Sequence, residues 1–347
     1  PLTPSIFFDK ILVFATQFCY AKKYRQRRQA FPRFCGRLPV HATCSASARI
    51  GGTPVEPEKP HQPEDQQPQE IQQPAQPPEA LLPGKFYIQV QDTTLALGAL
   101  AAWYRSLYDI PVVQVTGSAG KTTTKEMIAA VLSQRFSTLK TQANFNNAIG
   151  TPLTLLNLAP EHQAAVIETG MNHFGEIRYL GEMVRPTVAV ITNVGDAHIE
   201  NLGGTRQGIL QAKCEIFENL QPGGLAVLNG DDELLSGLTL PFETVLCGQH
   251  KRCGVRVANV AEHGIDGVTC TVSTVRDVYE VSIPSPGAYM IYPAAMAIAI
   301  GEHLGLTKAE MLAGIAAYRP VGSRMHLVRC SNDRIIIDDC YNANPQA

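Results

Sequence analysis

Short apolar runs alternate with amphipathic stretches over the last three quarters of the chain. Four of the runs are strand-like in length and composition: Phe86–Val90, Val112–Val115, Ala164–Glu168 and Thr187–Thr192. Between them, apolar residues recur at helical spacing, as in the stretch from Thr93 to Tyr108. This alternation predicts a three-layer α/β domain with a mostly parallel sheet, and such sheets bind ligands at the carboxyl ends of their strands.

A glycine loop follows the run Val112–Val115 and leads directly into a helical pattern. Gly117 and Gly120 allow tight backbone turns, so that successive N–H groups and the start of the helix can face an anion. Lys121 adds a positive charge, and Thr122 offers a hydroxyl group to Mg²⁺. The segment therefore predicts a phosphate-binding loop (P-loop).

The spacing of this loop differs from the usual P-loop pattern. Only Ser118 and Ala119 separate the two glycines, whereas the pattern Gly-x-x-x-x-Gly-Lys-Ser/Thr has a longer insertion there. An ordinary strand-to-helix turn is the alternative interpretation. The strand before the loop and the helix after it favour phosphate binding; the helix is indicated by Met127, Ile128, Val131 and Leu132.

Polar residues stand at the carboxyl ends of the next two predicted strands. Glu168 ends one strand, and Asn193–His198 follows the other. Together with the P-loop they would meet at one point, where a hard cation bridging nucleotide phosphates needs oxygen or imidazole ligands. Taken singly, such a glutamate is usually solvated or capping and a lone histidine is usually structural. Lys213, in the helical stretch Gln211–Phe217, would ordinarily be solvated.

Several motifs follow one another in an order that resembles the Mur ligase family. They are Thr116–Thr124, Asn144–Asn147, Glu168–His173, Thr192–Glu200, Ala212–Ile216 and Asp338–Pro345. The resemblance runs from about Gln89 to the end of the chain. It is greatest to the members that join D-alanyl-D-alanine to UDP-N-acetylmuramoyl-tripeptide in making the peptidoglycan precursor. No single motif is specific, but their ordered succession is.

The resemblance implies an ATP-dependent amide (peptide) ligase. An unactivated carboxylate does not accept an amine, so such an enzyme first transfers the γ-phosphoryl group of ATP to the carboxylate, and the amine then attacks the acyl phosphate. Positioning and charge neutralisation carry most of that phosphoryl transfer. The implied cofactors are ATP and Mg²⁺, and the implied substrates are the UDP-muramoyl-peptide and D-Ala-D-Ala.

The family pattern also implies roles for individual residues. The residues implied to bind ATP are Gly117, Ser118, Ala119, Gly120, Lys121, Thr122, Thr123, Asn193, Arg324 and Asp339. The implied Mg²⁺ ligands are Thr122, Glu168, His198 and Lys213, the last as a carbamate, which turns a cation into a carboxylate-like ligand. The implied catalytic residues are Lys121, Lys213 and His198. The residues implied to approach the UDP-peptide are Asn146, Asn147, Asn172 and His173.

The chain departs from the family pattern at four positions. Ala148 stands where the family has an acidic or polar residue, and Cys340 replaces a serine or threonine. Tyr289 and Pro293 stand where a histidine and an adenine-contacting asparagine are expected. Because proline has no backbone N–H, these changes put adenine binding in question.

The first 84 residues differ in composition from the rest. Residues 1–50 carry nine lysines and arginines against the single acid Asp9 and end in a small-residue stretch, which resembles an organelle transit peptide and predicts a plastid location. A misjoined coding stretch is the alternative for this segment. Residues 51–84 are rich in proline and glutamine, which predicts a disordered linker.

The net charge bears on binding partners, and the cysteine content bears on the redox state of the compartment. A net charge of -2 and a pI of about 6.6 give no overall attraction to nucleic acid or membranes. The nine cysteines show no C-x-x-C pair, which favours reduced thiols and leaves a cytoplasmic location as the alternative to the plastid. No apolar run reaches the length of a membrane span.

The resemblance divides the remainder into three parts. Residues 85–108 would be a remnant of the UDP-substrate-binding domain, 109–323 the central ATP-binding domain, and 324–347 the start of a truncated C-terminal ligase domain. We therefore expect that the chain as given does not complete amide synthesis. A non-catalytic Mur-like protein that binds nucleotide as a scaffold is the alternative, and a folate-polyglutamate type ligase is a weaker third choice.

Overall fold

A computed structural model describes residues 11–15, 86–330 and 334–341. The predicted linker 51–84 lies outside the described residues, as does the predicted transit segment 1–50 apart from its residues 11–15. Those five residues form β1 (Ile11–Ala15), which pairs in parallel with β2 (Phe86–Val90). The strand at Phe86–Val90 was predicted, whereas its partner was not.

One sheet of nine strands forms the centre of the part of the chain that the structure describes. Its strands, from one edge to the other, are β11 (Val278–Ile283), β10 (Val268–Ser273), β9 (Val255–Glu262), β8 (Glu243–Gly248), β7 (Leu225–Asn229), β6 (Val188–Ile191), β3 (Val112–Thr116), β5 (Ala164–Glu168) and β4 (Thr138–Lys140). The strands from β4 to β9 are parallel, and β9, β10 and β11 are antiparallel. The predicted mostly parallel sheet is confirmed.

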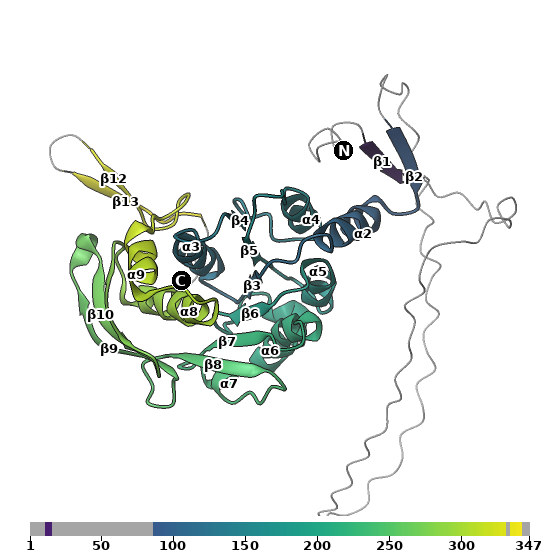
Figure 1. The fold of residues 1–347 in the computed structure, drawn as a ribbon. Helices are drawn as coiled ribbons and strands as arrows, with labels where there is room; N and C mark the ends of the chain where they lie inside the picture. The colour runs from purple at the N-terminus through teal and green to yellow at the C-terminus, as the bar shows by residue number, and fades with distance from the viewer. Residues whose placement is uncertain (1–10, 16–85, 331–333, 342–347) are drawn as a thin grey trace, which may run out of the picture.

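Helices cover both faces of this sheet and complete three layers (Figure 1). The α-helices are α2 (Thr93–Arg105), α3 (Lys121–Leu132), α4 (Gly150–Leu155), α5 (Glu176–Val184), α6 (Arg206–Cys214), α7 (Glu233–Ser236), α8 (Ile291–His303) and α9 (Lys308–Ala317). The short 3₁₀ helices are η1 (Ile199–Leu202), η2 (Glu215–Asn219), η3 (Gly264–Asp266) and η4 (Ala288–Met290). Helices α3, α8 and α9 pack on one face, and α2, α4, α5 and α6 lie on the other.

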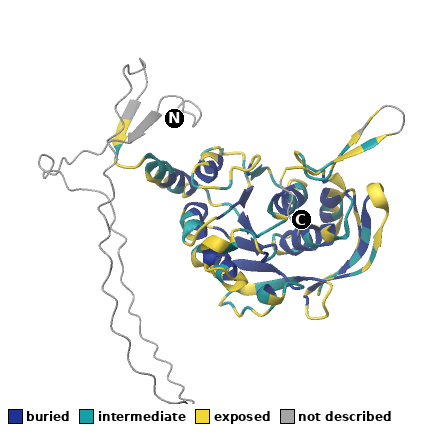
Figure 2. Cartoon of the chain, turned by 180° about the vertical axis from the view of Figure 1, so that it is seen from behind, coloured by how far each residue is buried: buried dark blue, intermediate teal, exposed yellow. Residues whose placement is uncertain are grey.

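The central strands are buried on both faces, which is why their sequences read as continuous apolar runs. In β3, Val113 and Val115 pack with α3 and α8, whereas Val112 packs with α2 and α4. The other central strands divide their side chains in the same alternating way. Figure 2 shows the result as buried strands inside a shell of exposed helix surfaces and loops.

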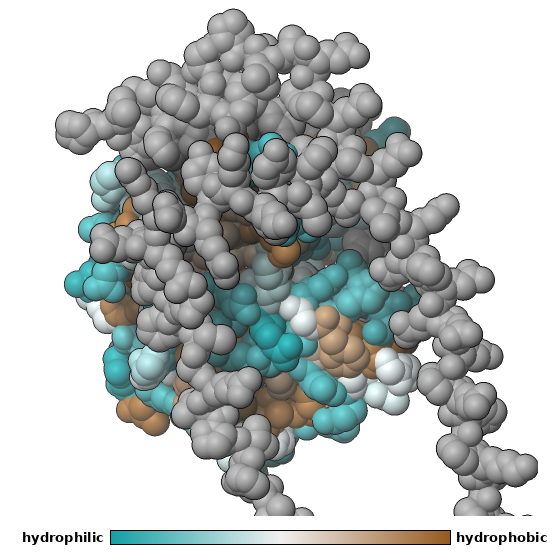
Figure 3. Space-filling view, turned by 90° about the vertical axis from the view of Figure 1, so that its right-hand side faces the viewer, coloured by the Kyte–Doolittle hydropathy of each residue, from teal (hydrophilic) through white to brown (hydrophobic). Residues whose placement is uncertain are grey.

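Helix α2 ends three residues before the predicted end at Tyr108. The chain after the helix continues in turns, in which the N–H groups of Leu107 and Tyr108 donate to the carbonyl groups three residues earlier. The buried Arg105 side chain donates from Nη1 to Tyr108 O and from Nε to Val184 O, which ties the end of the helix to α5. The outer residues Leu95 and Trp103 remain exposed. In the coloured areas of Figure 3, apolar and polar residues are interspersed on the surface.

The described part of the C-terminal segment forms a hairpin of its own. β12 (His326–Arg329) and β13 (Ile335–Asp338) pair antiparallel in a two-stranded sheet that extends from the body of the domain (Figure 1). Two α-helices, α8 and α9, precede it, and the apolar run Ala294–Ile300 is buried within α8. Among the described residues, no helix combines the length and the apolar character that crossing a bilayer would require.

Candidate functional site

The glycine loop joins the carboxyl end of β3 to the start of α3. Gly120 is the residue before the helix and has a left-handed backbone (φ +76°), which glycine adopts without a steric penalty. Gly117 has a φ of +153°, and a Cβ atom there would lie 1.9 Å from Thr192 Oγ1. The loop thus needs glycine at one position for its conformation and at the other for close approach to the neighbouring strand end.

Residues after β6 hold this loop from behind. The side-chain Oδ1 of Asn193 accepts a hydrogen bond from Ala119 N at 2.8 Å, and the backbone carbonyl oxygen of Asn193 accepts one from Ser118 N at 3.1 Å. Thr192 Oγ1 donates to Ala119 O at 2.6 Å, and Gly195 N donates to Ser118 Oγ at 2.8 Å. Asn193, predicted to contact ATP, therefore also fixes the shape of the P-loop.

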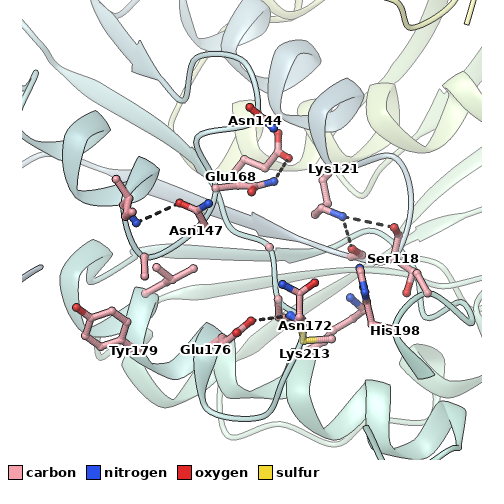
Figure 4. Close-up of a pocket in the computed structure, with 18 of the residues that line it drawn as sticks. Ser118, Lys121, Asn144, Asn147, Glu168, Asn172, Glu176, Tyr179, His198 and Lys213 are labelled. Carbon is pink, nitrogen blue, oxygen red and sulfur yellow. Dashed lines mark hydrogen bonds between the residues drawn. The ribbon is translucent and has the colours of Figure 1, made fainter. Parts of the chain in front are cut away.

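A cavity of about 490 Å³ opens on one side of the loop (Figure 4), and we call it the first cavity. The predicted site residues that line it are Gly117, Ser118, Lys121, Asn146, Asn147, Glu168, Asn172, His198, Lys213 and Arg324. Lys121 and Glu168 stand on one side of it, and Lys213, Asn172 and His198 on the other. The sheet therefore brings together residues that are widely separated in the sequence.

Glu168, at the end of β5, is the buried carboxylate of the first cavity, which the more exposed Glu176 also lines. Its side chain is almost fully buried, and Oε1 accepts a hydrogen bond from Asn146 Nδ2 at 2.9 Å. Its other oxygen, Oε2, is buried without a hydrogen-bond partner among the described residues. A buried carboxylate oxygen that makes no hydrogen bond is costly unless a cation or another partner approaches it.

Two lysines with lowered pKa values face the first cavity. Lys121 Nζ donates to Gly117 O at 2.8 Å, and burial lowers its pKa although the Glu168 carboxylate acts in the opposite direction. Lys213, in the last turn of α6, is 3 % exposed. Burial, and then the positive charge of Lys121, lower the pKa of Lys213 well below its ordinary value. Burial therefore destabilises the ammonium form of Lys213 relative to its neutral amine.

A second cavity, of about 280 Å³, lies on the other side of the loop. The predicted ATP-binding residues that line it are Ala119, Gly120, Thr123, Asn193, Arg324 and Asp339. Its remaining wall is largely aromatic and apolar, with Tyr289, Tyr292, Met290, Pro293, Met296 and Tyr318. Arg324 lines both cavities, and its guanidinium carbon lies 4.4 Å from the centre of the Tyr341 ring.

The departures at Tyr289 and Pro293 fall in this second cavity. The Tyr289 ring lies against the backbone of Gly287, where an added Cβ atom would be 2.3 Å from Cε1, and it is 43 % exposed. The Tyr292 hydroxyl group donates to Asp231 Oδ2 at 3.0 Å, and burial together with that carboxylate raises the pKa of Tyr292 to about 12. The cavity thus offers ring faces where the family pattern has polar side chains.

Three predicted residues have positions that fit their roles less directly. Thr122 is buried in the first turn of α3 and is outside the described lining of both cavities. His173 is exposed, with its Nδ1 3.4 Å from Glu176 Oε1. It is outside the described lining of the first cavity. Asn147 lines the first cavity, but its Oδ1 accepts hydrogen bonds from Ile149 N and Gly150 N at the start of α4.

Sequence reasoning missed several lining residues. Tyr179 and Thr94 reach the first cavity from α5 and α2, and no local pattern marks them. Asn229, at the end of β7, lines the second cavity and was open to prediction, because it is a polar residue that directly follows an apolar run, as Glu168 is. Tyr292 and Tyr318 resemble ordinary core aromatics in sequence.

The first cavity does not contain a complete cage for a metal ion. Within the described part of the chain, no three His, Cys, Asp or Glu side chains converge in a metal-binding group. Mg²⁺ usually binds through one or two carboxylates together with substrate phosphates, and keeps several waters. The free Glu168 Oε2 beside the P-loop fits that mode, so these residues suit a cation that arrives with a nucleotide.

Comparisons with known proteins agree with this geometry. Residues 115–301 match the family model of the Mur ligase middle domain. The UDP-N-acetylmuramoyl-tripeptide--D-alanyl-D-alanine ligase of Escherichia coli (strain K12) is 39% identical over 266 residues, which is 74% of this chain and 57% of that protein. The chain thus spans little more than half the length of this relative.

Solved structures of MurF show the same fold. A crystal structure of MurF from Acinetobacter baumannii superposes with a TM-score of 0.72 at 33% identity, covering 78% of this chain and 59% of that one. MurF ligase from Thermotoga maritima in complex with ADP superposes with a TM-score of 0.68 at 27% identity, covering 77% and 62%. The matched family model covers the P-loop, Glu168, His198 and Lys213, and the chain belongs to the Mur ligase family.

Proposed function

We propose that this chain forms the nucleotide-binding part of an ATP-dependent amide ligase that adds D-Ala-D-Ala to UDP-N-acetylmuramoyl-tripeptide. The observation that supports it most is the first cavity, where the P-loop, a buried carboxylate and a buried lysine of lowered pKa share one space. The names of the relatives, and the ADP in one MurF structure, support the same choice of substrate and nucleotide.

In this proposal the two cavities divide the nucleotide between them. The N–H groups at the start of α3 and Lys121 hold the phosphates, because an anion is favoured at a helix N-terminus and beside a lysine. The second cavity takes the base and ribose, with the Tyr289 ring as a stacking surface in place of hydrogen-bonding side chains. Arg324, which lines both cavities, contacts the nucleotide between them.

The peptide substrate approaches from the asparagine side of the first cavity. Asn146 and Asn172 line it there, and they would orient the terminal carboxylate toward the γ-phosphate. The γ-phosphoryl group moves to that carboxylate and leaves ADP; the amine of D-Ala-D-Ala then attacks the carbonyl carbon, and inorganic phosphate leaves as the amine loses a proton. The role of the chain is chiefly to hold these groups in line and to balance their charge.

Glu168, Thr122, His198 and Lys213 are the proposed holders of Mg²⁺. When bound, the cation would neutralise charge on the phosphate oxygens. Lys213 would take part as a carbamate, and its buried, neutral-favouring environment supports this because the free amine is the form that reacts with CO₂. A ¹³C NMR signal from labelled bicarbonate, absent in Lys213→Ala, would identify the modification.

The test begins with the full chain and calorimetry. We expect ATP with Mg²⁺ to bind, and Glu168→Gln to weaken that binding while leaving ADP without metal unaffected. Absence of any ATP binding by the unaltered chain would refute the proposal.

The amide-forming step needs a second experiment, because the relatives are longer. A chimera of the Escherichia coli ligase, with its matching segment replaced by residues 115–301, should form UDP-muramoyl-pentapeptide. The same chimera with Lys121→Ala is the matched control and should not. Equal product from both would mean that the P-loop does not drive the reaction.

We also propose that residues 1–50 direct the protein to plastids, because they are strongly basic, carry only the acid Asp9 and end in small residues. A fluorescent reporter fused to this segment should enter plastids and be processed. Diffuse cytoplasmic fluorescence of the unprocessed fusion would refute it.

A further inference from the structure

The P-loop helix carries another buried lysine, Lys125, which has no role in the reaction as proposed above. Its side chain is fully buried, yet it lies one turn beyond the loop. Its Nζ donates to Thr141 O at 2.6 Å and pairs with Glu126 Oε1 at 2.9 Å, and Glu168 Oε2 lies 3.9 Å away. A buried ammonium group is costly unless it is paired and hydrogen-bonded, so these oxygens explain how the fold tolerates it.

Lys125 reaches Glu168 by two routes. The direct route is the ion pair with the carboxylate. The indirect route runs through Thr141, just after β4: Lys125 holds its carbonyl oxygen, and the backbone N–H of Glu168 donates to its Oγ1 at 3.0 Å. The lysine therefore ties α3 to the ends of β4 and β5 from inside, and both routes restrain the same carboxylate.

The contacts of Glu168 are divided between its two oxygens. Oε1 is occupied by the hydrogen bond from Asn146, whereas Oε2 accepts no hydrogen bond among the described residues and has Lys125 as its ion-pair partner there. A separation of 3.9 Å is within reach of an ion pair but too long for a hydrogen bond, so the lone pairs of Oε2 remain free. We propose that Lys125 is a positioning residue that directs Glu168 Oε2 toward the divalent cation without occupying it. This inference rests on the proposed cation site.

The positive charge of Lys125 would by itself repel a cation, and this repulsion opposes the gain in cation binding from orienting Glu168. Glu126 Oε1 lies closer to Nζ than Glu168 Oε2 does, 2.9 Å against 3.9 Å, and neutralises most of the charge. The other oxygen of Glu126 pairs with Lys140. The four charges balance, so the loss of orientation should outweigh the relief of repulsion.

The test measures cation binding directly, on the full chain. Mn²⁺ serves as the probe, titrated by electron paramagnetic resonance in the presence of ATP. Lys125→Met, of similar shape and no charge, should weaken Mn²⁺ binding about tenfold or more, as is typical when a partner of a metal ligand is lost. Affinity for ADP without metal should stay unchanged, because Lys125 does not line either cavity among the described residues.

Two variants separate positioning from a general structural effect. Lys140→Met removes a charge from the same carboxylate, Glu126, but the described residues show Lys140 in an ion pair with Glu126 alone, so Mn²⁺ binding should not change. The double variant Lys125→Met/Glu126→Gln keeps the buried charges balanced and guards against unfolding, and it should behave like Lys125→Met.

Each outcome decides the matter. Unchanged or tighter Mn²⁺ binding by Lys125→Met overturns the inference, and so does an equal loss of ADP affinity in both Lys125 variants, which would mean a structural role. If Glu168→Gln leaves Mn²⁺ binding intact, the proposed cation site itself is wrong. Weaker Mn²⁺ binding by Lys125→Met and the double variant, with Lys140→Met unaffected, supports the inference.

Discussion

The two cavities on either side of the P-loop are built from different kinds of residue. The first is lined by asparagines, lysines and a carboxylate that follow strand ends or stand in short motifs. The second also has polar residues beside the loop, among them Arg324 and Asp339, but its other wall consists of tyrosines, methionines and a proline, most of them from η4 and the start of α8. The first cavity is therefore suited to charged groups that react, and the second to an uncharged ring that only has to be held.

The largest expected effect is that of Lys121→Ala on the first cavity. Hydrogen bonds to charged groups contribute about 1.5–3 kcal/mol, so affinity for ATP and for inorganic triphosphate should fall at least roughly tenfold. Calorimetry with both ligands checks this, with Lys251→Ala as a control on an exposed turn. Equal affinities of the variant and the unaltered chain would show that phosphates bind elsewhere.

Arg324 lines both cavities, so it could contact either the phosphates or the base and ribose. Arg324→Ala should weaken ATP and triphosphate alike, by about tenfold, since a guanidinium group near the phosphates is lost. Isothermal titration with both ligands measures it, and Arg334→Ala, exposed on the hairpin, is the control. A variant that loses affinity for ATP alone would place Arg324 against the base or ribose instead.

Tyr289→Ala tests whether the second cavity holds the base by stacking. Stacking of a base on an aromatic ring contributes about 1–3 kcal/mol, so ATP affinity should fall about tenfold while triphosphate affinity stays the same. Tyr289→Phe keeps the ring and should bind ATP normally. If GTP, ITP and ATP bind the unaltered chain with widely different affinities, polar contacts and not stacking select the base.

The smallest effect concerns the loss of stability that burying Lys213 causes. Because its folded pKa is below the ordinary 10.5, the unfolded state binds more protons between those two values, and stability should rise with pH in that window. In bicarbonate-free buffer, Lys213→Met should raise the melting temperature by a few degrees at neutral pH, and the gain should shrink toward pH 10.5. A gain that is constant with pH would mean that packing, and not charge burial, is responsible.

The residues at the strand ends of both cavities could be predicted from the sequence, for a physical reason. In a parallel sheet the strands are buried on both faces, so they appear as apolar runs, and a polar residue at the end of such a run has few places to go except the carboxyl edge. Glu168 of the first cavity and Asn193 of the second were found in this way, and the same rule would have found Asn229 of the second cavity.

The remaining site residues could not be predicted, because their roles depend on packing between segments that are remote in the chain. Lys125, Tyr179 and Tyr292 stand in helices whose patterns say that a face is buried but not against what, so their roles depend on which strand end each helix covers. Lys125 and Lys121 lie one turn apart on the same helix. Lys125 contacts Thr141 and Glu168, whereas Lys121 faces the first cavity. The sequence predicted that phosphates would bind at the start of α3. The packing of α3 against β4 and β5 places Lys125 beside the buried carboxylate, because burial and distance are set by neighbours that are remote in the chain.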